Sequence, residues 1–159
     1  MPQKKFRLKG MDKLMKRINE EVQQIEGRTL KGIIRSVILI HRDVEPMIPV
    51  DLGNLRASWF TVTTTGEGKT LTPSFNGDAA AKLSIDHHAI TQAAQANLPQ
   101  GKRQPAARFG FTANYASWVH ENVGANFQRT GAEARFLYKA IRRNEDNILE
   151  TIRQDAQIK

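Results

Sequence analysis

The chain has 159 residues, of which 40% are hydrophobic and 25% charged, and its formal net charge is +8. It holds no cysteine, which excludes disulfides and thiolate metal sites. No apolar run approaches the roughly 20 residues of a membrane span, and no apolar signal core follows the basic first residues. We therefore expect one globular domain, made and used in the cytoplasm and not associated with a membrane.

Positive charge is concentrated near the N-terminus. Residues 1–35 contain ten Lys or Arg against four Asp or Glu. We expect residues 1–10 to form a basic flexible arm and residues 11–159 to form the single domain. The charge favours an anionic partner, either DNA or an acidic protein surface, although a solvated helix face explains it equally well. The candidate contact residues are Lys4, Lys5, Arg7, Lys9, Lys13, Lys16 and Arg17.

A long amphipathic helix is predicted from Met11 to about Val44, because apolar residues recur there at spacings of three and four. Gly27 and Gly32 lie within it, and each costs about 1 kcal/mol of helix propensity relative to Ala, which would allow a break or bend near Gly27. Residues 36–40 are apolar nearly all round, which predicts that this end is the more buried. A helix of this length either crosses a sheet and protrudes or packs against neighbouring subunits.

The helix is predicted to end before Pro49, which fixes its own φ and disfavours helix in the residue before it. Asp51 is a good N-cap for a short helix in which Leu55 faces inward and Arg56 outward. The β-branched and aromatic residues that follow predict a strand over 58–65.

The segment 66–106 is predicted to be a hairpin followed by an extended loop or weak helix. Gly66–Lys69 is a turn signal, and 70–75 reads as the second strand of the hairpin. Pro73 gives that strand an edge position. A weak helix is expected over 79–98, where Ala and Gln are abundant.

A third strand is predicted over 108–113, and Asn114 is a plausible N-cap for a helix over 115–121. The closing helix is predicted from Ala132 to about Ile158. Inward-facing positions predict that the aromatic residues form the core, and the alternative is a base-stacking platform on a basic sheet. These residues are Trp59, Phe109, Phe111, Tyr115 and Trp118. The fold class is therefore α+β, with an antiparallel sheet of about three strands flanked by long N-terminal and C-terminal helices.

Three motifs, in this order, resemble those of a family of small tailed-phage virion proteins, the HK97 gp10-like, minor capsid, neck or tail-completion proteins. They read Pro-Val-Asp-Leu-Gly-Asn-Leu-Arg-Ala-Ser-Trp at 49–59, Asn-Tyr-Ala-Ser-Trp-Val-His-Glu at 114–121 and Ala-Arg-Phe-Leu-Tyr-Lys-Ala-Ile at 134–141. The residues that carry the resemblance are Pro49, Asp51, Gly53, Leu55, Arg56, Trp59, Tyr115, Trp118, His120, Glu121, Phe136 and Leu137.

The resemblance implies a structural protein of the phage neck, assembled in the host cytoplasm as a ring of identical subunits between portal complex and tail. Its implied partners are further copies of the chain, other neck, connector and tail proteins and, by non-specific contact, the packaged DNA. A ring needs one patch of a subunit to bind a different patch on the next. The N-terminal helix with its arm is one candidate patch, and the segment 66–106 is the other.

No catalytic, metal or cofactor site is predicted. The neighbouring His87 and His88 point apart in any regular structure, and no metal-binding or nucleotide-binding motif is present. His120 and Glu121 are consecutive, so their side chains diverge, and His120 is expected to be structural or to lie in an interface. Two alternatives remain open: a basic protein that binds nucleic acid outside a virion, and an enzyme whose site has no recognisable motif.

Overall fold

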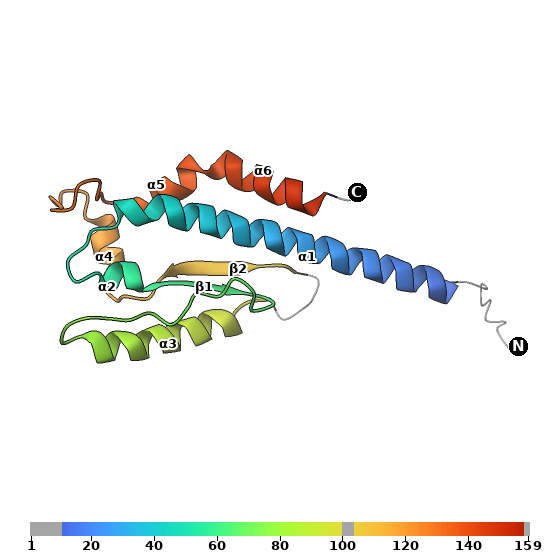
Figure 1. Ribbon diagram of the computed structural model, residues 1–159, viewed down its shortest axis with the longest axis horizontal. Coiled ribbons are helices and arrows are strands. Elements are labelled where there is room, and N and C mark those ends of the chain that lie inside the picture. Colours follow the sequence, from blue (N-terminus) through green and yellow to red (C-terminus); the bar gives the residue numbers. More distant parts are fainter. Residues whose placement is uncertain (1–10, 100–103, 158–159) are drawn as a thin grey trace, which may run out of the picture.

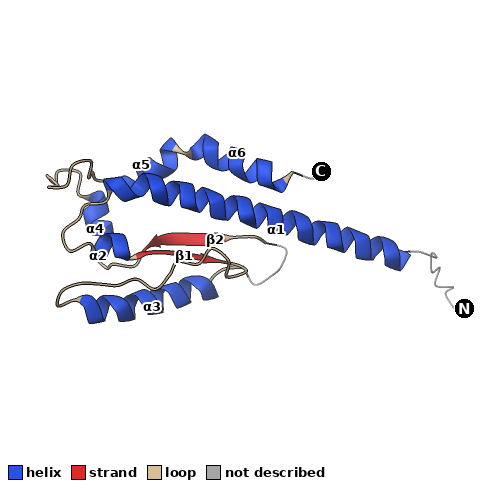
Figure 2. Cartoon of the chain, viewed as in Figure 1, coloured by secondary structure: helices blue, strands red, loops and turns tan. Residues whose placement is uncertain are grey.

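The computed structural model describes residues 11–99 and 104–157. Figures 1 and 2 show a layered arrangement: α5 and α6 lie along α1, α1 covers one face of the two strands, and α3 covers the other. The expected mixture of helices and antiparallel sheet is confirmed. The elements are α1 (Met11–Val44), the 3-10 helix η1 (Glu45–Met47), α2 (Asn54–Ala57), β1 (Trp59–Thr63), α3 (Ala80–Ala96), β2 (Ala107–Phe111), α4 (Ala116–Glu121), α5 (Phe136–Arg143) and α6 (Glu145–Ala156).

The helix α1 is unbroken over 34 residues, so the glycines do not interrupt it at Gly27. Gly32 has a packing role instead, because a Cβ there would lie 2.9 Å from Cα of Ile152 in α6. The two helices are also joined by an ion pair in which Arg35 Nη1 lies 2.9 Å from Asp155 Oδ1. The missing side chain of Gly32 thus lets the α6 backbone approach α1 closely.

The predicted single closing helix is wrong, because it is divided at Asn144 into α5 and α6. The buried Asn144 amide donates to the carbonyl of Ala140 at 2.9 Å and to Asp43 Oδ2 in α1 at 2.9 Å. A side chain that bonds the backbone of its own helix competes with the regular helical pattern. The bond to Asp43 fixes this junction against the C-terminal part of α1.

The strand β1 pairs with β2 in antiparallel register, from Trp59 opposite Phe111 to Thr63 opposite Ala107. All five residues of β1 are buried. Trp59 belongs to the main core under α1, whereas Phe60 and Val62 belong to a second cluster that includes Ala94 and Leu98 of α3 and the segment after it. Because alternate side chains of a strand point to opposite faces, β1 supplies both clusters.

The hairpin predicted after β1 is wrong, because 70–75 is not a strand and the described residues form a two-stranded sheet. Within the described residues, one backbone hydrogen bond follows the predicted pairing, from the Thr70 N–H to the Thr61 carbonyl at 3.4 Å. Pro73 has no N–H to donate. Leu71, which precedes Pro73 in the same segment, is 88% exposed, so its side chain does not pack against the rest of the protein.

The main core forms around the C-terminal part of α1. Val37, Ile40 and Val44 are buried there, which confirms that this end of the helix is the more buried, although Ile38 is 62% exposed. Leu55 and Phe136 join the same cluster. Two of the resembling motifs thus supply anchors of the core.

Candidate interaction site

The first two motifs meet at a groove of about 640 Å³ at one end of the molecule. Residues 49–55 form one side of it, Tyr115 and Val119 another, and the loop 126–128 a third. Asp51 is the one charged residue among the described residues that line it. Leu52 is exposed at the groove, whereas Leu55 is buried. The groove is therefore largely apolar, with a single acidic group.

Tyr115 lies at this groove as a hydrogen-bond donor. Burial, and then the negative charge of Asp51, raise the pKa of Tyr115 above its ordinary value of 10.0. The phenol is therefore protonated at neutral pH, and its O–H is available to an acceptor. The groove thus offers a hydroxyl donor and a carboxylate within an apolar surface.

The backbone of the first motif departs from the expected caps. Gly53, rather than Asp51, is the N-cap of α2, with a φ of 82° and no side-chain cap hydrogen bond. This left-handed conformation suits glycine, which lacks a Cβ. At the second motif the N-cap of α4 is Tyr115, rather than Asn114, again without a side-chain hydrogen bond. Both predicted capping residues are therefore wrong, although the short helices that they were expected to start are present.

An amide clasp that was not predicted holds the groove wall. The Asn54 amide donates to the Asn76 carbonyl at 2.8 Å, and the Asn76 N–H donates to Asn54 Oδ1 at 2.8 Å. Asn54 is buried, and the Asn76 amide also donates to the Leu52 carbonyl at 3.2 Å. In sequence Asn76 is a turn residue and Asn54 a variable position of the motif, so neither gave a signal.

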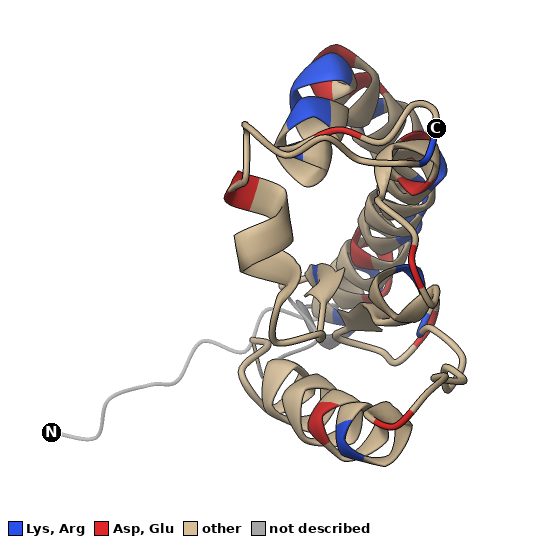
Figure 3. Ribbon diagram, turned by 90° about the vertical axis from the view of Figure 1, so that its left-hand side faces the viewer, with Lys and Arg blue, Asp and Glu red and all other residues tan. Residues whose placement is uncertain are grey.

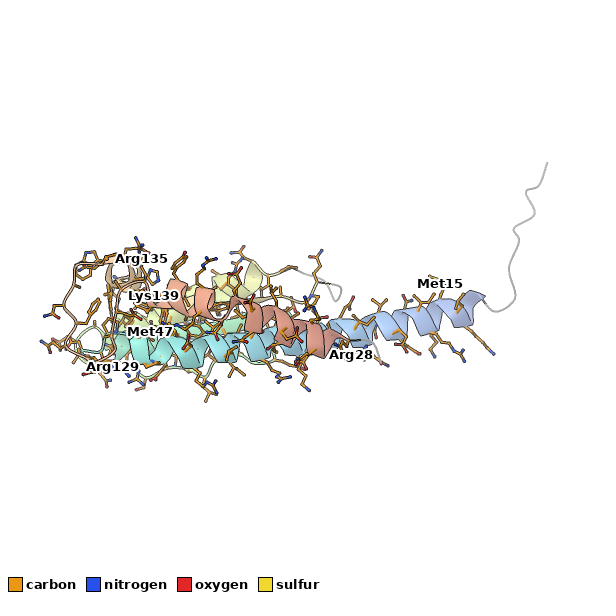
Figure 4. The ribbon with its side chains drawn as sticks, turned by 90° about the horizontal axis from the view of Figure 1, so that it is seen from above. Met15, Arg28, Met47, Arg129, Arg135 and Lys139 are labelled. Carbon is orange, nitrogen blue, oxygen red and sulfur yellow. The ribbon has the colours of Figure 1, made fainter. Side chains whose placement is uncertain are left out.

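A second unpredicted contact comes from the loop before α5. Arg129 Nη1 donates to the carbonyls of Glu45 and Ile48, each at 3.0 Å. These carbonyls follow the end of α1, where helix geometry leaves acceptors unpaired. Arg129 therefore ties the loop that borders the groove to the base of the long helix, and Figure 4 shows it at this end of the molecule.

The second and third motifs meet at His120. Its carbonyl accepts the Arg135 N–H at 2.6 Å, and its Nε2 lies 3.4 Å from the Tyr138 N–H in the first turn of α5. Its Nδ1 lies 2.6 Å from Glu121 Oε1, so the prediction that these two consecutive side chains diverge is wrong. Its ring meets the buried Phe136 edge to face at 4.9 Å. The imidazole thus links α4 to the start of α5, as expected of a structural residue.

Arg135 completes this junction in a backbone conformation that is rare for a residue with a Cβ. Its φ is 57°, and it is the N-cap of α5. Its Nε lies 3.7 Å from Glu121 Oε2. Leu137 is partly buried against the core, and Arg56, from the first motif, is exposed and paired with Glu45.

Two aromatic residues that were expected in the core lie at the surface. Trp118 is 69% exposed and Tyr115 is partly exposed at the groove. The reason is the short length of α4, which buries Ala116 and turns Val119 toward the core. Trp59 is in the core as predicted, with its ring 5.5 Å from that of Phe109 and 5.2 Å from that of Phe111.

The opposite end of the molecule is the N-terminal part of α1, which we call the free half (residues 13–22). Figure 1 shows α1 extending past the strands and past the end of α6, and Figure 4 shows Met15 on this projection. Leu14 is 54% and Ile18 45% exposed. Leu14 and Ile18 lie on the same face of α1 as Gly32 and Ser36, because the positions 14, 18, 25, 32 and 36 follow the helical repeat. Gly32 and Ser36 are contacted by α6. The apolar row therefore continues after its partner helix has ended.

The basic candidates of the free half are distributed around the helix. Lys13, Lys16 and Arg17 are exposed, and at about 100° per residue Lys16 falls opposite the apolar row, whereas Arg17 lies beside it. Figure 3 shows charged residues gathered on α1, α5 and α6, whereas α3 and α4 are mostly uncharged. The remaining candidates, Lys4, Lys5, Arg7 and Lys9, lie outside the described residues.

Two other histidines, His41 and His87, pack against aromatic rings. The ring centroids of His41 and Trp59 are 4.6 Å apart, and His87 Nδ1 lies 2.8 Å from Thr112 Oγ1 beneath Phe75. Burial lowers the pKa of both histidines, helped by Arg56 at His41 and by His88 at His87. Over residues 11–99 and 104–157, no three His, Asp or Glu side chains are grouped so that they could hold a metal ion.

None of the helices in the described part of the chain has both the length and the hydropathy to cross a bilayer. Comparisons of the chain with models of known protein families, with curated proteins and with solved structures find no match.

Proposed function

We propose that the protein is a structural component of the neck of a tailed phage, of the tail-completion or head–tail joining kind, and that it works as a ring of identical subunits. The observation that carries the proposal is the uncovered apolar row on the free half of α1. A helix that displays such a row to water gains stability when another apolar surface covers it. The three motifs then supply the rigid body from which this helix projects.

The described features support an assembly role more than a chemical one. The groove, the free half and the exposed Trp118 are surfaces that a partner could cover, and exposed aromatic side chains are frequent anchors of protein interfaces. The ion pair Arg35–Asp155 and the bonds of Asn144 hold α1 rigidly against the body. Ring formation would use these surfaces between neighbouring copies.

The direct test is deletion of the gene from its phage, followed by electron microscopy of the particles. We expect tailless heads together with free tails, and restoration of joined particles by the wild-type gene supplied in trans. Joined, infectious particles after clean deletion would refute the proposal.

The alternative, a nucleic-acid-binding protein that acts outside a virion, is favoured by the basic side of the free half. Sequence-independent phosphate contact weakens steeply as salt rises. A variant in which Lys13, Lys16 and Arg17 are replaced by Glu separates the two functions. The neck role predicts that the isolated wild-type chain binds duplex DNA weakly. It also predicts that the variant alters particle assembly or DNA retention. The alternative predicts tight binding by the wild-type chain, lost in the variant.

A further inference from the structure

We propose that the free half of α1 in one copy docks into the 640 Å³ groove of the next copy, so that neighbouring subunits meet head to tail. This inference rests on the proposed ring, since it names the two different patches that a ring requires. The free half and the groove lie at opposite ends of the molecule (Figure 1). A contact between them is therefore made with another copy.

The groove matches the free half in apolar character. Leu14 and Ile18 project from a single face of the helix and are about half exposed. The groove presents Leu52, Val119 and Phe127 along its walls. Burying two leucine-sized side chains in such a surface is strongly favourable, because each removes apolar area from water.

The two surfaces also match in charge. Asp51 is the charged residue among the described residues lining the groove, and it is acidic. The free half carries three basic residues, Lys13, Lys16 and Arg17, against two acidic ones, Glu20 and Glu21, and is therefore weakly basic. Lys16 is paired with Glu20 at 3.9 Å. Of the three basic residues, Arg17 precedes Ile18 and is the nearest to one edge of the row, so its long side chain reaches a carboxylate at the rim. A weakly basic helix with an arginine beside its apolar row is thus a better occupant than a second groove or the acidic helix α6.

Other exposed surfaces of the protein are less suitable binding sites for the free half. Ile38 is exposed on α1, but Lys31 and Arg42 lie on the same face of that helix and would repel a basic occupant. Two free halves packed parallel and in register would place Glu21 of one copy beside Glu21 of the other, because Glu21 lies at the edge of the apolar row. The groove is therefore the surface that matches the free half both in apolar character and in charge.

The chain has no cysteine, so engineered pairs report the contact without background. One copy carries Ile18→Cys and a second, distinguishable by a tag, carries Leu52→Cys. Both positions are exposed, so neither change removes a core contact. After mixing under mild oxidation, we expect a disulfide-linked heterodimer, identified by mass.

Two matched mixtures serve as controls. Glu20→Cys lies two residues from Ile18 on the far side of the helix, and it should cross-link poorly with Leu52→Cys. Ile18→Cys should also cross-link poorly with Ile38→Cys, which is exposed elsewhere. Adding Asp51→Arg to the Leu52→Cys copy should lower the yield about tenfold, since it places a like charge opposite the basic helix.

Three outcomes overturn the inference: predominant homodimers of Ile18→Cys, preferred cross-linking to Ile38→Cys, or equal yields from Glu20→Cys and Ile18→Cys. If phage lacking the gene lose joined tails and yet no 18–52 cross-link forms, the neck function stands and the docking fails. If the cross-link forms but deletion leaves particles joined, the docking stands and the neck function fails.

Discussion

The close approach of α6 to α1 at Gly32 gives a sharp test of the fold. In Gly32→Ala, the added Cβ would lie 2.9 Å from Cα of Ile152 and 3.3 Å from the Thr151 carbonyl oxygen. Contacts between carbon atoms are favourable at about 3.5–4.0 Å, so α6 must move away by roughly half an ångström or more. The helix would then lose contact along its length.

Gly27→Ala is the matched control, because it lies in the same helix and a Cβ there meets nothing within 4 Å. Both substitutions gain about 1 kcal/mol of helix propensity. This gain cancels when the two variants are compared, so the difference between them isolates the crowding at α6. Overpacking in well-packed regions costs about 1–3 kcal/mol.

We therefore expect Gly27→Ala to raise the free energy of unfolding by about 1 kcal/mol and Gly32→Ala to lie about 1–3 kcal/mol below it. Urea titration of both variants at one protein concentration measures this difference, and hydrogen exchange should show loss of protection in α6 of Gly32→Ala. Equal stabilisation by the two substitutions would refute the described packing of α6 on α1.

Three further predictions concern the body of the molecule. Because burial lowers the pKa of His41 and His87 from an ordinary value of 6.5, the unfolded chain takes up protons first, so the free energy of unfolding should fall as pH drops from about 7 to 5. Replacing both histidines with Gln should flatten this dependence, and an unchanged slope would contradict the assignment. Asn54→Ala removes both 2.8 Å bonds of the clasp and should lower stability by about 2 kcal/mol in urea titration, whereas a loss below about 0.5 kcal/mol would mean that the clasp does not form. Trp59→Ala should cost about 3–5 kcal/mol and leave little cooperative thermal unfolding, unlike a surface change such as Trp118→Ala, which should leave the melting temperature nearly unchanged.

Periodic patterns predicted the elements that are long or strongly patterned. The apolar spacing of α1, the β-branched run of β1 and the Ala-rich α3 all occur where expected, within a few residues. Local sequence patterns gave wrong predictions where the structure depends on a partner that is distant in the sequence. The segment 70–75 has strand-forming residues beside a turn, but β1 pairs with β2, and Pro73 and the exposed Leu71 leave the segment without a ladder.

The candidate site was predicted only in part, for a similar reason. Spacing placed Tyr115, Trp118 and Val119 on one face, but a helix of six residues buries only its innermost side chains, so Trp118 remains outside. The clasp of Asn54 and the bonds of Arg129 join segments separated by 22 and by more than 80 residues. No local pattern encodes such contacts, because the residues that make them are far apart in the sequence.

Because α1 continues without a break through Gly27, the direction in which the side chains of its free half point depends on how many residues separate them from the body. Each residue turns a helix by about 100° and advances it by about 1.5 Å. Inserting one residue after Gly27 would rotate the leucine and isoleucine side chains of the free half by about 100° around the helix axis relative to the body, while leaving the sequence of the free half unchanged. Inserting seven would restore their bearing and merely extend the reach by about 10 Å. The number of residues in the helix therefore sets both the direction in which the apolar row faces and its distance from the body.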